Sequence, residues 1–286
     1  MYSRFKDYLL LMRLHRPIGI FLLLWPTLWA LWFAADGTPP FKVLLVFIVG
    51  TVLMRSAGCA INDYADREID PHVARTRERP LAAGRITPDE ALRLFVAVSL
   101  IAFGLLTSLH SIAAILLAIP AALLAASYPF MKRWISIPQA YLGIAFSWGI
   151  PMAYVVLRPQ FPWCEMLLLV AANLMWVIAY DTQYAMVDRD DDLRIGVKSS
   201  AIWFGRHDRL IVALLHAASL ALLLILGLIT ARGGFYFAGL CAAAGFAVYQ
   251  YVLTRSREPA ICFRAFLNNN YFGLSVFLGL LLDRLV

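Results

Sequence analysis

The first residues that could carry chemistry form an acidic segment at the end of an apolar stretch, N-D-Y-A-D-R-E-I-D at residues 62–70. If a helix continues through it, Asn62, Asp66 and Asp70 are four residues apart and share one face. Carboxylates placed this closely repel one another unless a cation lies between them. Oxygen ligands of this kind suit Mg²⁺, which uses substrate phosphates as further ligands. The spacing therefore favours a metal site over the alternative, a solvated helix end.

A second acidic segment, Y-D-T-Q-Y-A-M-V-D-R-D-D-D, occupies residues 180–192. Asp188 and Asp192 are again four residues apart, and Asp181 lies two turns earlier, within the apolar stretch. An ionisable group at that depth is costly and usually faces a polar cavity. A structural hydrogen bond to a neighbouring helix is the alternative interpretation of Asp181.

Two segments with the same spacing can together hold two Mg²⁺ ions around one diphosphate. Basic side chains would then neutralise the charge that builds on a departing diphosphate. Anchoring of loops to anionic lipid is the alternative role for each of them. The basic residues available near the two segments are Arg75, Arg79, Lys132, Arg133, Arg189 and Lys198.

The elements that position these segments are membrane helices. The 286 residues are 62% hydrophobic and only 15% charged, with a mean hydropathy of +0.73, whereas soluble domains are about 25% charged. Lipid leaves backbone groups unsatisfied outside helices and closed barrels, and the alternation typical of a barrel is absent. We therefore expect nine membrane helices in a single domain over residues 1–286. They are predicted at residues 18–35, 41–61, 91–109, 112–128, 137–157, 164–187, 210–230, 235–253 and 263–282.

The charges predict the orientation of these helices. Basic residues gather before the first span and after each even-numbered one, which places the N-terminus and both acidic segments on the cytoplasmic side. The net charge of +7 forms no basic face with interleaved aromatic residues, so nucleic acid is not an expected partner. The first span lacks a cleavage pattern and is expected to remain in the mature protein. The four cysteines are expected to be packing residues.

At these motifs the sequence resembles the UbiA superfamily of membrane prenyltransferases, and within it the bacterial enzymes that prenylate 4-hydroxybenzoate for ubiquinone synthesis. The resemblance covers nearly the whole chain. It is carried by residues 62–70, Arg75-Thr76, Arg79-Pro80 and residues 180–192, with support from residues 15–19, 24–30, 128–133 and 268–271.

The resemblance implies an all-α bundle of nine transmembrane helices around a central cavity in the bacterial inner membrane, with its active site facing the cytoplasm. It implies Mg²⁺ as cofactor, held by Asn62, Asp66, Asp70, Asp188 and Asp192. Catalysis is assigned to these four aspartates and Arg133. The expected substrate-binding residues are Asn62, Arg16, Arg75, Tyr128, Lys132, Asp181, Tyr184 and Lys198.

The implied reaction joins polyprenyl diphosphate to 4-hydroxybenzoate at the carbon ortho to the hydroxyl, and it releases diphosphate. Metal ions assist departure of the diphosphate, and burial in the bilayer keeps water from the allylic cation. Arg16 and Arg55 are the candidates for binding the acceptor carboxylate. Arg55 has an alternative role as a counter-charge to Asp63 or Asp66. No obligate protein partner is expected beyond the lipid bilayer.

Three other functions fit parts of the pattern. Another aromatic acceptor within the same superfamily would use the same metal motifs. A cation-coupled transporter would also bury carboxylates in a helical bundle, but its sites tend to lie near the midplane in broken helices. A phosphatidyltransferase of the CDP-alcohol type would keep its aspartates in one compact segment, whereas the two acidic segments lie far apart in this chain.

Overall fold

The computed structural model describes residues 2–73, 75–131 and 133–284, with the side chains of residues 2 and 3 left out. Within these ranges the chain is helical and contains no strand. The helices are α1 (Tyr2–Leu11), α2 (Ile18–Ala35), α3 (Phe41–Ala65), η1 (Asp70–His72), α4 (Pro88–Thr107), α5 (Ile112–Met131), α6 (Pro138–Ser147), α7 (Gly149–Leu157), α8 (Trp163–Ile195), α9 (Ser200–Phe204), η2 (Gly205–His207), α10 (Asp208–Ile229), α11 (Gly234–Leu253), η3 (Thr254–Ser256) and α12 (Pro259–Leu282).

The predicted membrane spans are confirmed. Nine helical segments of the described chain are long and apolar enough to cross a bilayer, and each overlaps one of the nine predicted ranges. The fifth span differs from the prediction because it is broken at Trp148, between α6 and α7. Pro151 has no N–H, and its ring clashes with the carbonyl four residues earlier, which accounts for an interruption at this point.

Local signals set the helix ends that matter for the acidic segments. Thr87 and Glu90 form a capping box at the start of α4, with reciprocal side-chain and backbone hydrogen bonds. Gly196 ends α8 with a φ of 74°, and its N–H donates to the Asp192 carbonyl. Glycine adopts this left-handed conformation at little steric cost. The second acidic segment is therefore wholly helical up to its last aspartate.

The chain divides into two compact units. Unit 1 comprises Met1–Leu23 and Phe41–Phe130, and unit 2 comprises Leu24–Pro40 and Met131–Val286. The chain passes between them three times, within α2, at the start of α3 and near the end of α5. A single domain around a central cavity stays a prediction.

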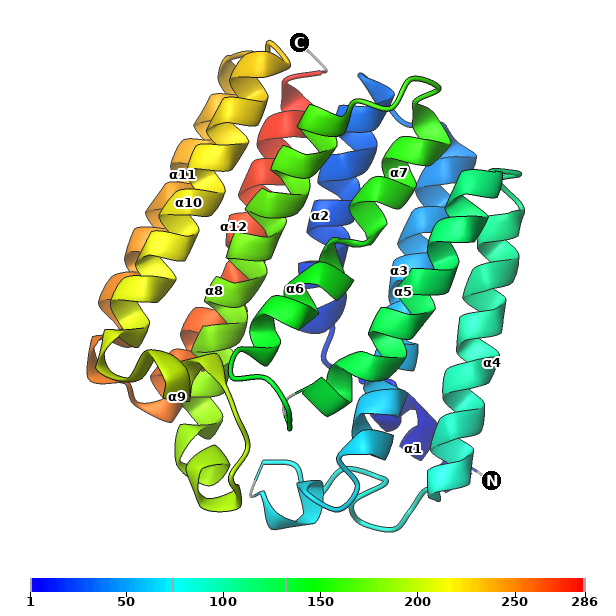
Figure 1. Ribbon diagram of the computed structural model, residues 1–286, viewed down its shortest axis with the longest axis vertical. Coiled ribbons are helices and arrows are strands. Elements are labelled where there is room, and N and C mark those ends of the chain that lie inside the picture. Colours follow the sequence, from blue (N-terminus) through cyan, green and yellow to red (C-terminus); the bar gives the residue numbers. More distant parts are fainter. Residues whose placement is uncertain (1, 74, 132, 285–286) are drawn as a thin grey trace. The chain divides into compact units, whose positions relative to one another are not determined.

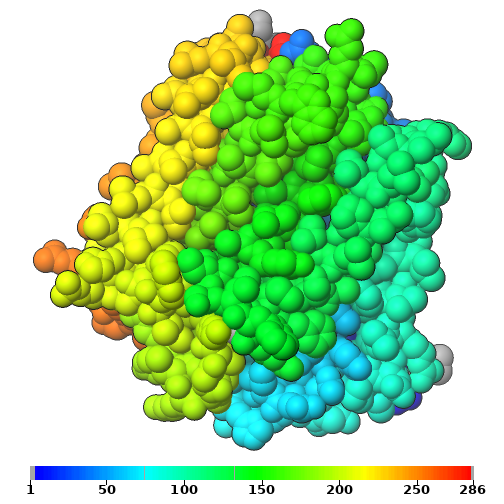
Figure 2. Space-filling model, in the orientation of Figure 1, coloured from blue at the N-terminus to red at the C-terminus, as the bar shows by residue number. Residues whose placement is uncertain are grey.

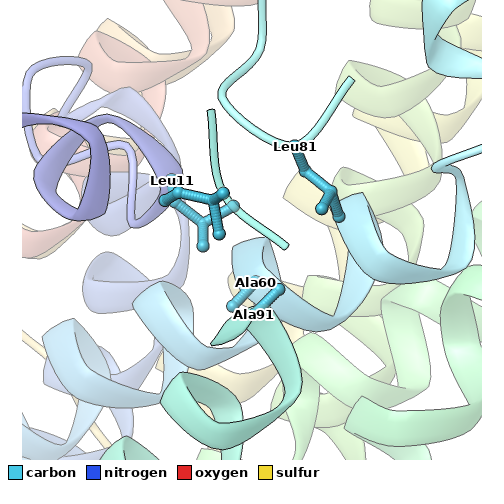
Figure 3. Close-up of a cluster of buried hydrophobic side chains, with 5 residues drawn as sticks. Leu11, Ala60, Leu81 and Ala91 are labelled. Atoms are coloured by element: carbon cyan, nitrogen blue, oxygen red, sulfur yellow. The ribbon is translucent and has the colours of Figure 1, made fainter. Parts of the chain in front are cut away.

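The core of unit 1 packs α1 against the segment that carries the first acidic motif. Leu11, Ala60, Leu81 and Ala91 form a buried cluster together with Ile86 (Figure 3). These residues come from α1, α3, the connection after η1 and α4. The cluster thereby fixes the long connection between α3 and α4 from both ends.

The core of unit 2 is built from aromatic side chains and close helix contacts. The Trp176 ring lies 5.2 Å from Trp29 and stacks on Phe272 at 5.3 Å. Helices α11 and α12 pack closely at Gly239, where an added Cβ would lie 2.6 Å from the Ser275 carbonyl oxygen. In Figure 1, α8, α10, α11 and α12 run alongside one another. Helices of membrane proteins approach this closely where small residues line the contact.

One side of α10 carries exposed apolar side chains. The helix is yellow in Figure 2 and lies on the surface of the face shown. Its exposed leucines are Leu210, Leu214, Leu224 and Leu228. A surface of this composition suits lipid, in agreement with a multi-pass membrane protein.

Candidate active site

The first acidic motif lies where α3 ends, and its backbone keeps the helical hydrogen-bond pattern. The N–H of Asp66 donates to the Asn62 carbonyl at 3.0 Å, and the N–H of Asp70 donates to the Asp66 carbonyl at 2.8 Å. The three residues are therefore one turn apart, as predicted, although α3 itself ends at Ala65 and Asp70 begins η1. Asn62 Nδ2 donates to Asp66 Oδ2 at 3.2 Å, so these two side chains are already adjacent.

Arg79 ties the last aspartate of this motif to the helix. Its Nη1 atom lies 2.7 Å from Asp70 Oδ2 and 3.1 Å from Asp63 Oδ1. Asp63 also pairs with Arg13, which follows α1. All three carboxylates of the motif, Asp63, Asp66 and Asp70, are buried. Two arginines thus offset the charge of carboxylates that would otherwise repel one another without water to screen them.

Burial raises the pKa of Asp70 above its usual value. The nearby carboxylates of Asp66 and Asp63 act in the same direction, and the guanidinium of Arg79 opposes them. A divalent cation bound beside this carboxyl would favour its charged form, as Arg79 does. The donor set, two buried carboxylates and one amide oxygen, consists of hard oxygen ligands and fits Mg²⁺.

The second acidic motif occupies one stripe of α8. At 100° per residue, Asp181, Asp188 and Asp192 fall within about 40° of one another around the helix. All three are half-buried. Tyr184 lies beside this stripe and packs its ring against Phe266 at 4.8 Å. The structure therefore gives the three aspartates a common face and places an aromatic ring next to it.

An ion cluster fixes the connection that follows this motif. Asp208 is fully buried and accepts hydrogen bonds from Arg189 and Arg257, the latter from Nη2 at 2.9 Å. Arg189 also donates to the Ala201 carbonyl. Arg79 and Arg189, both considered as phosphate ligands from the sequence, are thus engaged by buried carboxylates of the protein.

The remaining predicted substrate ligands differ in how exposed their side chains are. Arg16, Arg75 and Arg133 are exposed, and Tyr128 is half-buried on α5. Lys198 is also exposed, and its Nζ donates to the Trp134 carbonyl at 3.0 Å. The Lys132 position lies outside the described residues.

No group of three or more His, Cys, Asp or Glu side chains close enough to ligate one ion occurs among the residues the structure describes. Neither motif therefore forms a complete protein-only cage. This is compatible with Mg²⁺, which commonly takes only one or two protein carboxylates and completes its octahedron with water and substrate phosphates.

Sequence reasoning missed the residues that organise the first motif. Arg13 carried no assigned role, Asp63 was considered only as a partner of Arg55, and Arg79 was grouped with the phosphate ligands. One signal was available: an aspartate inside the motif but out of the four-residue register, Asp63, needs a partner of its own. Which arginines would provide it depends on how the connection after Asp70 folds back, which the spacing does not reveal.

Comparison with known proteins identifies the chain. The pattern of the UbiA prenyltransferase family matches residues 23–277. A 4-hydroxybenzoate octaprenyltransferase of Chromohalobacter salexigens is 56% identical over 281 residues, covering 98% of this chain and 94% of that protein. One of Thiobacillus denitrificans is 55% identical over 284 residues, with coverage of 99% and 96%.

Solved structures agree with the fold. A UbiA homolog from Aeropyrum pernix superimposes with a TM-score of 0.81 at 25% identity, covering 93% of this chain and 97% of that one. A homolog from Archaeoglobus fulgidus, bound to GPP and Mg²⁺, gives a TM-score of 0.71 at 16% identity, with coverage of 95% and 99%. The chain is thus an integral membrane protein with nine apolar helical segments among its described residues, and it belongs to the UbiA prenyltransferase family.

Proposed function

We propose that this chain transfers a polyprenyl group from polyprenyl diphosphate to 4-hydroxybenzoate, ortho to the hydroxyl, in ubiquinone biosynthesis. The observation that carries the proposal is the match, at 55–56% identity over almost the entire chain, to proteins named 4-hydroxybenzoate octaprenyltransferase. The two oxygen-rich motifs supply the chemistry that such a transfer needs.

Asn62, Asp66 and Asp70 would hold Mg²⁺ at the first motif, and Asp188 and Asp192 would hold it at the second. The ion would act as a Lewis acid that stabilises the leaving diphosphate by several kcal/mol. Two findings support this assignment. The first motif places two buried carboxylates and an amide side chain one helical turn apart, and a family member has been solved with GPP and Mg²⁺.

The reaction breaks the bond between the allylic carbon and the diphosphate oxygen, and the bonding electrons leave with the diphosphate. The ring carbon beside the hydroxyl, enriched in electrons by that hydroxyl, then bonds to the allylic carbon. The ring proton is lost to Asp188 or to water. Each motif would contribute ligands to the metal that neutralises the diphosphate, so loss of either would prevent ionisation.

Basic and aromatic side chains would complete substrate binding. Arg133 and Lys132, with Arg75 and Lys198, would bind phosphate oxygens, which requires Lys198 to exchange its present acceptor, the Trp134 carbonyl. Tyr128, Tyr184 and Asp181 would lie along the prenyl chain near the reacting carbon.

The acceptor carboxylate would pair with Arg16 or Arg55. Arg16 is exposed and precedes α2, whereas Arg55 lies within α3 against Gly19. Asp63 is paired with Arg13 and Arg79, so the alternative role of Arg55 is that of a counter-charge to Asp66.

The protein would reside in the bacterial inner membrane with both acidic motifs on the cytoplasmic side. The concentration of arginine and lysine in the connections that carry the motifs supports this orientation. The chain would act as a single catalytic domain.

The test uses membranes that contain the protein, 4-hydroxybenzoate and a labelled polyprenyl diphosphate, with Mg²⁺ or with EDTA. We expect a prenylated hydroxybenzoate that forms only with the metal, and a loss of at least about a hundredfold in Asp66→Asn and in Asp188→Asn, because metal ligation provides several kcal/mol. Asp191→Asn is the matched control, since Asp191 only forms a 3.7 Å pair with exposed Arg194.

Competing acceptors separate the alternatives. Homogentisate and a dihydroxynaphthoate, offered at the same concentration, should give no comparable product. Preferential prenylation of either would assign the chain to another acceptor within the family. Unchanged turnover in Asp66→Asn or Asp188→Asn would remove that residue from the site.

A further inference from the structure

A continuous row of buried polar side chains links three helices of unit 2. Trp176 Nε1 on α8 donates to Asn269 Oδ1 on α12 at 3.0 Å, and Asn269 Nδ2 donates back to Gln183 Oε1 on α8 at 2.7 Å. Gln183 Nε2 donates to Gln250 Oε1 on α11 at 3.0 Å. Gln250 Nε2 then donates to Asn268 Oδ1 at 3.1 Å.

His216 adds a fourth helix, α10, to this network. Its Nε2 atom lies 3.2 Å from Asn269 Oδ1. Its Nδ1 atom lies 3.1 Å from the carbonyl oxygen of Val212 on the same helix. A neutral imidazole donates from one nitrogen only, so His216 donates to Asn269 in the tautomer that carries its proton on Nε2. Asn269 thus makes three hydrogen bonds to other helices, two of them to α8, and is the centre of the network. It is completely buried, as are Trp176 and Gln250.

The direction of the hydrogen bonds is fixed at one end. An indole nitrogen can only donate, so the oxygen of Asn269 must face Trp176 and its nitrogen must face Gln183. Because the oxygen of Gln183 accepts from Asn269, its nitrogen must face Gln250, and Gln250 in turn accepts through its oxygen. Turning any one amide would bring two oxygens or two nitrogens together. A buried network with such fixed donor and acceptor directions favours a single arrangement of its helices.

The network and the second acidic motif lie on different sides of α8. Trp176 and Gln183 are seven residues apart and share one face of the helix. Asp181 is two residues from Gln183, Asp188 is five and Asp192 is nine, which places the acidic stripe about 140–180° around the helix from Gln183. A rotation of α8 that moved Trp176 and Gln183 would therefore turn the aspartates through the same angle.

We propose that the hydrogen-bond network centred on Asn269 is a positioning device that holds α8 at the rotation required for Asp188 and Asp192 to meet the metal-bound diphosphate. The inference rests on the proposed function of those aspartates. Asn269 is a positioning residue: it contacts α8 through Trp176 and Gln183 and reaches the reaction only through that helix.

Asn269→Leu tests the link to the metal. Because one hydrogen bond between membrane helices changes an equilibrium by roughly threefold, loss of all three should raise the Mg²⁺ concentration for half-maximal rate by about tenfold or more. His216→Leu should give a smaller rise, and His216→Gln, which keeps a nitrogen donor, should restore most of it. Ser219→Ala is the control, a buried change three residues along α10 from His216.

The rate at which Cys262 is labelled would report a rotation of α8 without requiring that the enzyme be active. It is completely buried and clusters with Ala185 and Met186 of α8 and Ala201 of α9. In a Cys164→Ala, Cys241→Ala background, the remaining cysteines are both buried, Cys262 in unit 2 and Cys59 in unit 1. We expect a membrane-permeant maleimide to label Cys262 at least about threefold faster in Asn269→Leu, with Cys59 unchanged as the internal reference.

A rise in both the Mg²⁺ requirement and Cys262 labelling, with rescue by His216→Gln, supports the proposal. Faster labelling with an unchanged Mg²⁺ requirement would overturn it, because α8 would then turn without consequence for the motif. Unchanged labelling in Asn269→Leu and in His216→Leu would overturn it as well. Failure of the proposed function is a separate result, since the parent protein would then show no Mg²⁺-dependent transfer while Cys262 labelling still reported on α8.

Discussion

Arg79 holds Asp70 through a hydrogen bond of 2.7 Å from its Nη1 atom to the Oδ2 atom of the carboxylate. The same nitrogen reaches Asp63 on α3. A proposed metal ligand in the connection is thus fixed to the membrane helix by a cation of the protein itself. The geometry of the first motif therefore depends on a residue nine positions further along the chain.

Arg79→Gln should disrupt this arrangement. Removing one partner of a buried ion pair costs about 3–5 kcal/mol, because the remaining charge stays buried. We expect a lower melting temperature in detergent and prenyl transfer reduced at least about tenfold. Arg77→Gln is the matched control, since Arg77 is exposed and lies 3.8 Å from exposed Glu78. Equal activity in the two variants would show that Arg79 does not organise the motif.

Asp63→Asn should separate anchoring from metal binding. Asp63 is paired with Arg13 and Arg79, so its substitution should lower thermal stability while the Mg²⁺ concentration for half-maximal rate stays within about threefold. Asp66→Asn should instead abolish most of the rate at any Mg²⁺ concentration. Magnesium titrations of the initial rate in both variants provide the comparison. A large rise in the Mg²⁺ requirement of Asp63→Asn would make Asp63 a ligand.

Asp208→Asn should destabilise the connection after the second motif. Asp208 is fully buried and accepts from Arg189 and Arg257, and its replacement by asparagine leaves two guanidinium groups without a negative charge between them. We expect the free energy of unfolding to fall by about 3 kcal/mol. The measurement compares the thermal unfolding of Asp208→Asn with that of Asp191→Asn, whose exposed pair contributes about 0–1 kcal/mol. Equal melting temperatures would argue against a structural role for the ion cluster.

Gly239→Ala should weaken the contact between α11 and α12. An added Cβ would lie 2.6 Å from the Ser275 carbonyl oxygen and 2.9 Å from the Gly279 Cα atom, and backbone atoms cannot move aside as a side chain can. Overpacking of this kind costs about 1–3 kcal/mol. Gly245→Ala on the same helix has open space around the new methyl group and should be neutral or stabilising. The reverse order of melting temperatures would contradict the close contact.

The nine spans could be predicted from sequence because each requires only length and apolar composition. The common face of Asp181, Asp188 and Asp192 could also be predicted, since it follows from helical periodicity alone. The break at Trp148 was not predicted. A proline in a membrane helix is often accommodated by its neighbours, so Pro151 by itself does not specify an interruption.

The contacts that organise the site could not be predicted in the same way. Arg79 meets Asp63 because the connection after η1 folds back onto α3, and Asn269 meets Gln183 because α12 packs on α8. Both are contacts between distant parts of the chain, separated by 16 and 86 residues. Local spacing determines which residues share a helix face, whereas tertiary packing determines their partners.

Gly19→Ala should identify the cation that binds the acceptor. An added Cβ at Gly19 would overlap the Arg55 guanidinium, with Cζ at 2.8 Å, so the flexible end of Arg55 must move while the helices stay in place. If Arg55 binds the carboxylate of 4-hydroxybenzoate, the KM for this acceptor should rise at least about fivefold, as expected for loss of a charge-assisted hydrogen bond, with the KM for polyprenyl diphosphate unchanged. Gly58→Ala on α3, where a methyl group meets nothing within 4 Å, is the control. An acceptor KM that stays the same in Gly19→Ala but rises in Arg16→Gln would assign the carboxylate to Arg16, because only that arginine would then affect acceptor binding.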